Sequence, residues 1–202
     1  MKVRLGEAGT ARAWITIAAG FALLALAGMA LPHEALDWQP GLAWREPWRA
    51  LSAIAVHYSR LHLAANLAGA AVLALLGWAA AAPAAWACAW LVAWPLTQIG
   101  LGVAPQLAHF GGLSGVLHAG VVIVAVGLLA RPQAGMRRWI GAALLTGVAL
   151  KLLHEAAWQA PLLRHPQGWD IAVAPLAHLT GALAGLLCGL AASLLSLRDR
   201  PA

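Results

Sequence analysis

Charged side chains are scarce in this sequence, at 10% of 202 residues, whereas a soluble domain carries roughly 25%. Hydrophobic residues make up 62% of the chain, and its mean hydropathy is +0.76. This composition argues against a soluble domain and predicts an integral membrane protein embedded in a lipid bilayer. The excess of 13 Lys and Arg over 7 Asp and Glu suits cytoplasmic loops and lipid headgroups, so we expect no nucleic-acid partner.

Cysteine and metal-binding patterns are also lacking. The two cysteines, Cys88 and Cys188, lie in apolar runs without a CxxC spacing, which argues against a disulfide or a reactive thiol. The HExxH pattern is absent, which argues against a zinc protease. We therefore predict that the protein uses no metal and no cofactor.

Six apolar segments have roughly the length that crosses the hydrocarbon core. They are approximately 13–31, 61–82, 84–103, 112–130, 139–158 and 174–197. The alternating pattern of a barrel strand is absent, so the segments are predicted to be helices. We expect the first segment to be retained, because it lacks a clear cleavage site. The whole chain, 1–202, is predicted to form one all-α membrane domain whose Trp-rich connection 32–59 lies in the outer interface.

Lys and Arg residues are distributed unevenly between the two sides of this predicted bundle. One side carries Lys2, Arg4, Arg12, Arg131, Arg137, Arg138, Arg198 and Arg200, and the other carries Arg45, Arg49, Arg60 and Arg164. The richer side of a membrane protein usually faces the cytoplasm. Both termini are therefore predicted to be cytoplasmic.

Polar residues inside the predicted spans are candidates for function, because burying them in lipid is costly. His62 and Asn66 are four residues apart and share one helix face, as do Ser114 and His118. His178 lies near the start of the last span. The second, fourth and sixth spans all enter from the outer side. The sequence therefore predicts that these residues meet at one depth near the outer face.

This arrangement suits catalysis by a serine nucleophile. A serine hydroxyl needs a base to take its proton, and His178 is the candidate base. Ser114 lies at the start of its helix, where free N–H groups and the helix dipole favour a developing oxyanion. His62 and Asn66 can add side-chain donors. Each residue also has a purely structural interpretation, as a packing element or as a local hydrogen bond to the helix backbone.

Glycines flank the candidate residues on both helices. Gly112 and Gly115 remove bulk around Ser114. The last span carries a ridge of small residues below the histidine, at Gly181, Gly185 and Gly189. Such ridges are common in helix bundles and let two helices approach closely. A serine–histidine hydrogen bond across helices requires that approach.

Three motifs resemble those of the rhomboid intramembrane serine proteases. "EPWRALSAIAVHYSRLHLAAN" is similar to the rhomboid Trp-Arg loop followed by the His-x-x-x-Asn helix. "GLSG" is similar to the Gly-x-Ser-Gly nucleophile motif, and "AHLTG" to the Ala-His-x-x-Gly motif of the base helix. The resemblance covers nearly the whole chain and implies a bundle of six transmembrane helices.

The resemblance also implies a role for each matching residue. Ser114 would be the nucleophile and His178 the base, in a dyad with no acidic third member. His62 and Asn66 would support the oxyanion together with the backbone around Ser114. His57 would correspond to a further histidine near the water-accessible outer mouth.

Two positions depart from the family pattern. Val173 stands where many rhomboids have glycine, and His118 stands where many carry a tyrosine stacked on the base. We therefore expect His118 to be the residue that orients His178.

Three segments are closer to one bacterial subgroup, the rhombosortases: "GLSGVLHAG", "KLLHE" from Lys151 to Glu155, and "HLTGALAGLL". This likeness implies a location in the bacterial inner membrane and single-span substrates with a C-terminal Gly-Gly-type sorting tail. Such a tail comprises a glycine-rich motif, one hydrophobic helix and a basic end. Taken alone, Lys151 and Glu155 are also explained as an i, i+4 ion pair that lowers the cost of two charges in a span.

Two other functions stay open at this point. A catalytically inactive rhomboid-like protein could bind membrane clients, although such proteins usually lack the serine or the base. A small transporter could use the eight histidines, although no pair of broken helices is evident at mid-membrane. The sequence does not indicate an oligomeric state.

Overall fold

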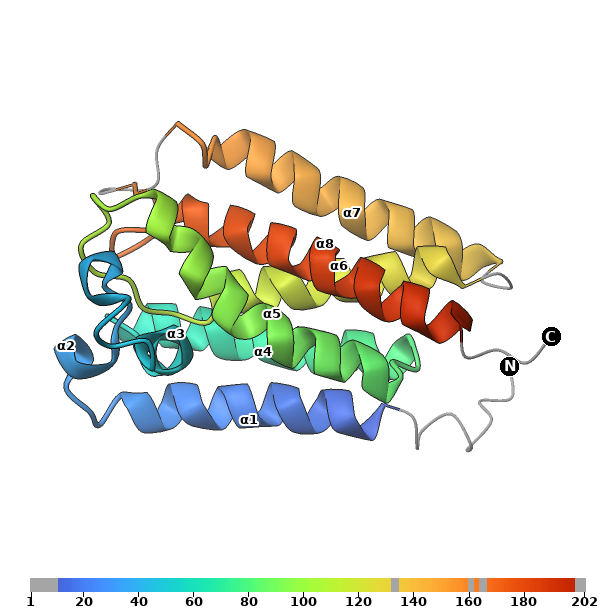
Figure 1. Ribbon diagram of the computed structural model, residues 1–202, viewed down its shortest axis with the longest axis horizontal. Helices are drawn as coiled ribbons and strands as arrows, with labels where there is room; N and C mark the ends of the chain where they lie inside the picture. Colours follow the sequence, from blue (N-terminus) through green and yellow to red (C-terminus); the bar gives the residue numbers. More distant parts are fainter. Residues whose placement is uncertain (1–10, 132–134, 160–161, 164–166, 199–202) are drawn as a thin grey trace.

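The computed structural model describes residues 11–131, 135–159, 162–163 and 167–198. Six long helices lie side by side as a bundle (Figure 1). They are α1 (Arg12–Gly28), α4 (Arg60–Ala79), α5 (Ala84–Gly100), α6 (Ser114–Ala130), α7 (Met136–Glu155) and α8 (Pro175–Arg198). Within these described ranges there is no strand, and two isolated bridges are the only β pairing. The prediction of an all-α bundle is confirmed.

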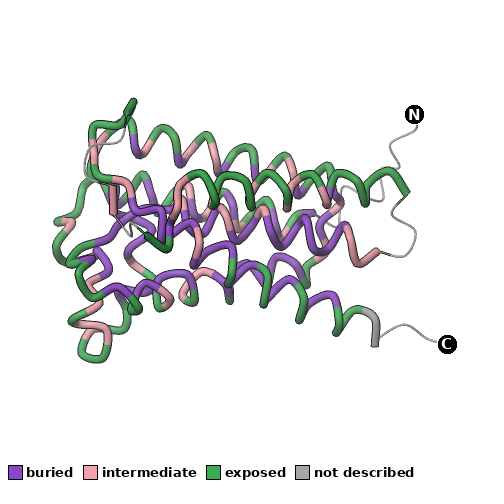
Figure 2. Tube along the Cα trace, turned by 90° about the horizontal axis from the view of Figure 1, so that it is seen from above, coloured by how far each residue is buried: buried purple, intermediate pink, exposed green. Residues whose placement is uncertain are grey.

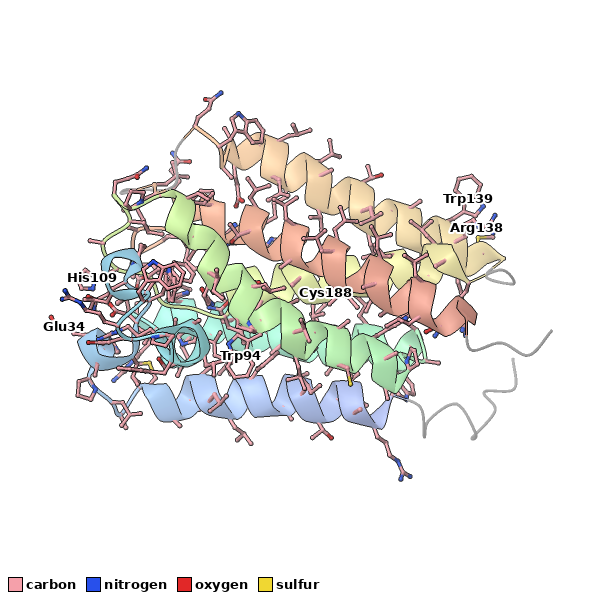
Figure 3. All side chains as sticks on the ribbon, viewed as in Figure 1. Glu34, Trp94, His109, Arg138, Trp139 and Cys188 are labelled. Atoms are coloured by element: carbon pink, nitrogen blue, oxygen red, sulfur yellow. The ribbon has the colours of Figure 1, made fainter. Side chains whose placement is uncertain are left out.

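Short helical turns fill the connections at one end of the bundle. They are α2 (His33–Leu36), η1 (Pro40–Leu42), α3 (Arg49–Ser52), η2 (Ala53–Ala55) and η3 (Leu101–Val103). This end, the α2/α3 end, also holds the starts of α4, α6 and α8 and the finish of α7 (Figure 1). Glu34 and His109 lie there, whereas Arg138 and Trp139 lie at the opposite end (Figure 3). The second, fourth and sixth predicted spans correspond to α4, α6 and α8, and these helices start at the same end of the bundle, as predicted.

The helix bounds agree with the predicted apolar segments to within three residues at every end. Three described stretches are long and apolar enough to cross a membrane by length and composition: Arg60–Ala79, Ala84–Val103 and Pro175–Ser196. The helices α1 and α6 are also apolar but have 17 residues each. The orientation prediction rests partly on Lys2, Arg4, Arg164 and Arg200, which lie outside the described residues.

Helix α6 lies at the centre of the bundle and packs against α4, α5, α7 and α8. It is apolar around its whole circumference, which is typical of a helix that is enclosed by others. Buried positions gather on the inward faces of the helices, and exposed positions lie on the outward faces (Figure 2). Many of the outward residues are leucines, as expected for a surface that contacts lipid tails.

The helices α6 and α8 approach closely because glycine lies on the contacting face. A Cβ atom added to Gly181 would lie 1.9 Å from the backbone oxygen of Gly115, and one added to Gly185 would lie 2.5 Å from that of Ala119. At Gly189 the nearest atom, the Cα of Ile123, would be 3.3 Å away. The predicted small-residue ridge is therefore confirmed, and its tightest part adjoins the residues after Ser114.

The tryptophans of α5 pack into the core. Trp86 and Trp90 are buried, and the Trp90 ring stacks on Trp14 of α1 with centroids 4.4 Å apart. Trp90 Nε1 donates to the Val116 carbonyl at 2.8 Å, and Trp14 Nε1 donates to the Leu73 carbonyl at 2.8 Å. These hydrogen bonds satisfy the polar end of each ring and join α1, α4, α5 and α6.

The connection 32–59 only partly follows the interfacial prediction. Trp44 and Trp48 are 98% and 53% exposed, but Trp38 is 2% exposed. The Trp38 backbone pairs with Phe110 through hydrogen bonds of 2.7 and 2.9 Å. Trp38 therefore fastens this connection to the loop before α6, while the other two rings remain free to meet an interface.

A buried carboxylate organises the same connection. Asp37 is 1% exposed and contacts Arg49, Tyr58 and His109 through its side-chain oxygens at 3.3, 3.3 and 2.7 Å. We call these four residues the Asp37 cluster. Burial and the neighbouring Asp37 both raise the pKa of Tyr58, so its hydroxyl keeps its proton and donates to the carboxylate.

Candidate active site

Ser114 and His178 meet at the α2/α3 end of the bundle. Ser114 is the first residue of α6, and His178 lies in the first turn of α8. The Ser114 Oγ is 3.1 Å from the His178 Nε2, which is a hydrogen-bonding distance. The close packing of α6 on α8 brings the two side chains together.

The backbone before Ser114 depends on glycine. Gly112 has a φ of +133°, a region that residues with a Cβ rarely adopt. A Cβ at this position would also lie 2.8 Å from the His62 ring. A Cβ on Gly115 would lie 2.6 Å from the Ala177 carbonyl oxygen. Gly112 therefore sets the turn into α6, and Gly115 permits the contact with α8.

His62 and Asn66 lie on the face of α4 that is turned toward this turn. Both are buried, at 8% and 3% exposure. The Ser59 hydroxyl caps α4 by accepting a 3.1 Å hydrogen bond from the His62 backbone N–H. Among the residues that the structure describes, the buried Asn66 Nδ2 and His62 Nδ1 have no hydrogen-bond partner. The Asn66 Nδ2 is thus an unpaired donor near Gly112, where an added Cβ would lie 3.8 Å from it.

The resemblance implied that His57 lies near an open outer mouth, but the structure places it in the interior. Its side chain is fully buried, and its ring centroid is 4.7 Å from that of His62. Its Nδ1 is 3.4 Å from the Ala55 carbonyl oxygen. Burial lowers the pKa of His57 and His33 adds to this, although the contact with Ala55 acts the other way. A neutral His57 ring therefore packs against the His62 ring.

His118 lies against His178. The two rings are stacked, with centroids 4.3 Å apart and planes inclined by 21°. The His118 Nδ1 is 2.7 Å from the carbonyl oxygen of Ser114, one turn earlier on α6. This hydrogen bond fixes the His118 ring, which in turn gives His178 a flat surface on which to rest.

The sequence reasoning missed Glu155 as a member of the site. Its Oε2 is 2.8 Å from the His178 Nδ1, and its other oxygen bonds to Lys151. The resemblance implied a dyad without an acidic member, yet a carboxylate here contacts the candidate base. The signal was the motif "KLLHE" together with span parity, because α7 ends at the α2/α3 end. The predicted Lys151–Glu155 ion pair is confirmed.

A cavity of about 1040 Å³ opens between α4, α6 and α7. Its polar wall contains Ser114, His178, His62, Asn66 and His118. The rest of its lining is mostly apolar and comes from α4, α6, the segment before α8, and α7, where it extends from Ile140 to Lys151. An extended or helical apolar segment could therefore lie along α7 with one end at Ser114. Within the described ranges, no three His, Cys, Asp or Glu side chains are grouped to hold a metal ion.

The family model of the Rhomboid domain matches residues 44–194, which include every residue of the site. The chain belongs to the rhomboid family. Rhomboids are intramembrane serine proteases, and the family together with the apolar helices makes this chain a multi-pass membrane protein. No curated protein matches the chain.

Proposed function

We propose that this rhomboid is an active intramembrane serine endopeptidase with Ser114 as nucleophile and His178 as general base. The observation that carries the proposal is the 3.1 Å contact between Ser114 Oγ and His178 Nε2 at the polar end of an apolar cavity. His178 accepts the hydroxyl proton while Ser114 Oγ attacks the scissile carbonyl carbon. His178 then returns the proton to the leaving amine nitrogen, and water hydrolyses the acyl-enzyme by the same route.

The oxyanion of the tetrahedral intermediate would be held at the start of α6. The first N–H groups of a helix have no partner within it and lie at the positive end of its dipole. The Asn66 amide and the His62 ring add donors from α4, and both residues line the cavity. Donors that are already in place stabilise the charge as it develops, without any reorganisation of solvent.

The proposed substrate is a single-span membrane protein with a C-terminal Gly-Gly-type sorting tail. Peptide bonds within a membrane helix are closed to a nucleophile, because their N–H and C=O groups are paired internally. Glycine disfavours helix by about 1 kcal/mol relative to alanine and adds no side chain. A glycine-rich junction would therefore unwind at Ser114 while the following apolar helix lies along α7.

We also propose that the α2/α3 end faces outward from a bacterial inner membrane and that both termini are cytoplasmic. Arg131 follows the end of α6, and Arg137 and Arg138 lie at the start of α7, at the opposite end of the bundle, where Figure 3 labels Arg138 and Trp139. Positive side chains favour the cytoplasmic side. Cleavage would then occur at the outer end of the client helix and release its exported domain.

A fluorophosphonate probe tests the chemistry, since it reacts with an activated serine. The protein in bilayers should be labelled at Ser114, and the Ser114→Ala variant should not. The substrate is tested by co-expressing a tagged Gly-Gly-tailed client with either form and mapping its new C-terminus by mass spectrometry. A wild-type protein that is neither labelled nor active would refute the proposed protease function. Cleavage of ordinary rhomboid substrates alone would refute the sorting-tail specificity.

A further inference from the structure

The Nδ1 atom of His178 has two neighbours of opposite character on α7. The Glu155 Oε2 is 2.8 Å away, and the Lys151 Nζ is 3.2 Å away. The His178 side chain is 8% exposed and that of Glu155 is 17% exposed, so bulk water competes weakly for the contact between them. Lys151 is more open, at 42% exposure.

These two neighbours require different tautomers of the imidazole. A carboxylate can only accept a hydrogen bond, whereas an ammonium group can only donate one. Pairing with Glu155 needs a proton on Nδ1 and leaves the Nε2 lone pair free to accept from Ser114 Oγ. Pairing with Lys151 needs a bare Nδ1, which places the proton on Nε2 and directs it at Ser114. Only the first tautomer can act as a base.

We propose that Glu155 is a positioning residue that selects the productive tautomer of His178, and that Lys151 becomes inhibitory once the carboxylate is removed. The inference rests on the proposed function of Ser114 and His178. In the intact protein the Lys151 ammonium bonds to Glu155, so its charge is paired with the carboxylate. Without the acid, the Nδ1 of His178, 3.2 Å from the Lys151 Nζ, remains as an acceptor for the ammonium.

The remaining charged and titratable neighbours do not replace Glu155. His118 faces His178 from α6 by stacking, and Ser114 faces it through Nε2. His62 reaches the same cavity from α4. Among these side chains of the described chain, Glu155 alone is an acid. It also balances the positive charge on the imidazolium that forms when His178 takes the serine proton.

The test is a set of variants at the two positions, measured by client cleavage and by the rate of fluorophosphonate labelling at Ser114. Glu155→Ala should lower kcat by about 1,000- to 10,000-fold with KM nearly unchanged, as expected when a triad histidine adopts the wrong tautomer. Lys151→Met in the otherwise intact protein should change kcat less than tenfold. Glu155→Asp should retain more activity than Glu155→Ala, because it keeps an acceptor on α7.

The double variant Glu155→Ala with Lys151→Met gives the decisive comparison. Removing the ammonium should raise the activity of Glu155→Ala at least tenfold, because nothing then holds Nδ1 in its bare form. If Lys151 and Glu155 formed only a structural ion pair, the double variant would be no more active than Glu155→Ala. His154→Ala, an exposed neighbour on the same turn, is the matched control and should behave as wild type.

The outcomes distinguish the role of Glu155 from the proposed protease function. If wild type labels at Ser114 and cleaves the client, but Glu155→Ala does so within threefold of its rate, the role of Glu155 is refuted and the protease stands. If Lys151→Met brings no recovery in the Glu155→Ala background, tautomer selection is refuted. Should Glu155→Ala fail to fold, the isosteric Glu155→Gln takes its place in the same cycle. A wild type without labelling or cleavage overturns both proposals.

Discussion

The α2/α3 end of the bundle contains two buried polar clusters that differ in how their hydrogen bonds are satisfied. In the Asp37 cluster the carboxylate contacts Arg49, Tyr58 and His109, and the Arg49 Nη1 also donates to the Glu34 and Asp37 carbonyls at 2.8 and 2.9 Å. In the candidate active site, among the residues described, the buried Asn66 Nδ2 and His62 Nδ1 have no partner. Buried polar groups are normally satisfied, so the unpaired atoms of Asn66 and His62, which line the cavity, support the proposal that they contact a substrate.

The two clusters therefore serve different purposes. The Asp37 cluster joins the connection 32–59 to the loop before α6, and its members bond mainly to one another. The candidate active site is built on the ends of four helices, and Ser114, His178, His62, Asn66 and His118 line a cavity. Mutations should separate the two clusters: one set should act on the chemical step, and the other on the stability of the fold.

The largest expected effect on activity is the loss of either reacting residue. Ser114→Ala and His178→Ala should each reduce cleavage by about 10⁶-fold, to background, because nucleophile and base act as a unit. Client cleavage and melting temperature are measured together, with Ser196→Ala, whose hydroxyl bonds to its own helix at Ala192, as the serine control. A Ser114→Ala protein that cuts at the wild-type rate would show that the candidate active site does not perform the chemical step, and its contrast with the Asp37 cluster would then fail.

The next effect is the loss of an oxyanion donor. Asn66→Ala should lower kcat by roughly 100- to 1,000-fold, as found when one such donor is removed, and His62→Ala should also cause a partial loss. Neither variant should lower the melting temperature much, because the Asn66 amide makes no hydrogen bond with the described part of the chain. Rates unchanged in both variants would show that this face of α4 does not touch the reaction.

A smaller effect is expected at His118. His118→Tyr should remain active, because a phenol ring can provide the same flat surface for His178. His118→Ala should lose roughly tenfold in kcat, since the base ring loses a stacking partner worth about 0.5–1.5 kcal/mol. The measurement is kcat between pH 6 and 8. Normal kinetics of His118→Ala throughout this range would refute the orienting role.

The helices could be predicted from the sequence because their signals are local. Apolar runs and proline breaks give each helix to within three residues, and span parity places Ser114 near His178 at one depth. The role of Glu155 could not be predicted, because it depends on how α7 packs against α6 and α8. In the sequence, the i, i+4 pairing of Glu155 with Lys151 was already a sufficient explanation for both charges. Burial of Trp38, Asp37 and His57 was also missed, because their connection has no helical periodicity from which an inward face could be read.

The smallest expected effect on catalysis, and the clearest contrast with the active site, comes from Arg49. Its side chain is 8% exposed and contacts Glu46 at 2.5 Å and Asp37 at 3.3 Å. Arg49→Ala removes one partner from a buried ion pair and leaves Asp37 under-compensated, which typically costs about 3–5 kcal/mol of stability. We expect a lower melting temperature but Ser114 labelling per folded molecule within threefold of wild type. The exposed Arg45→Ala is the matched control and should alter neither quantity. A large loss of labelling in a well-folded Arg49→Ala protein would mean that the Asp37 cluster also sets the geometry at Ser114, through the His109 contact and the loop that leads into α6.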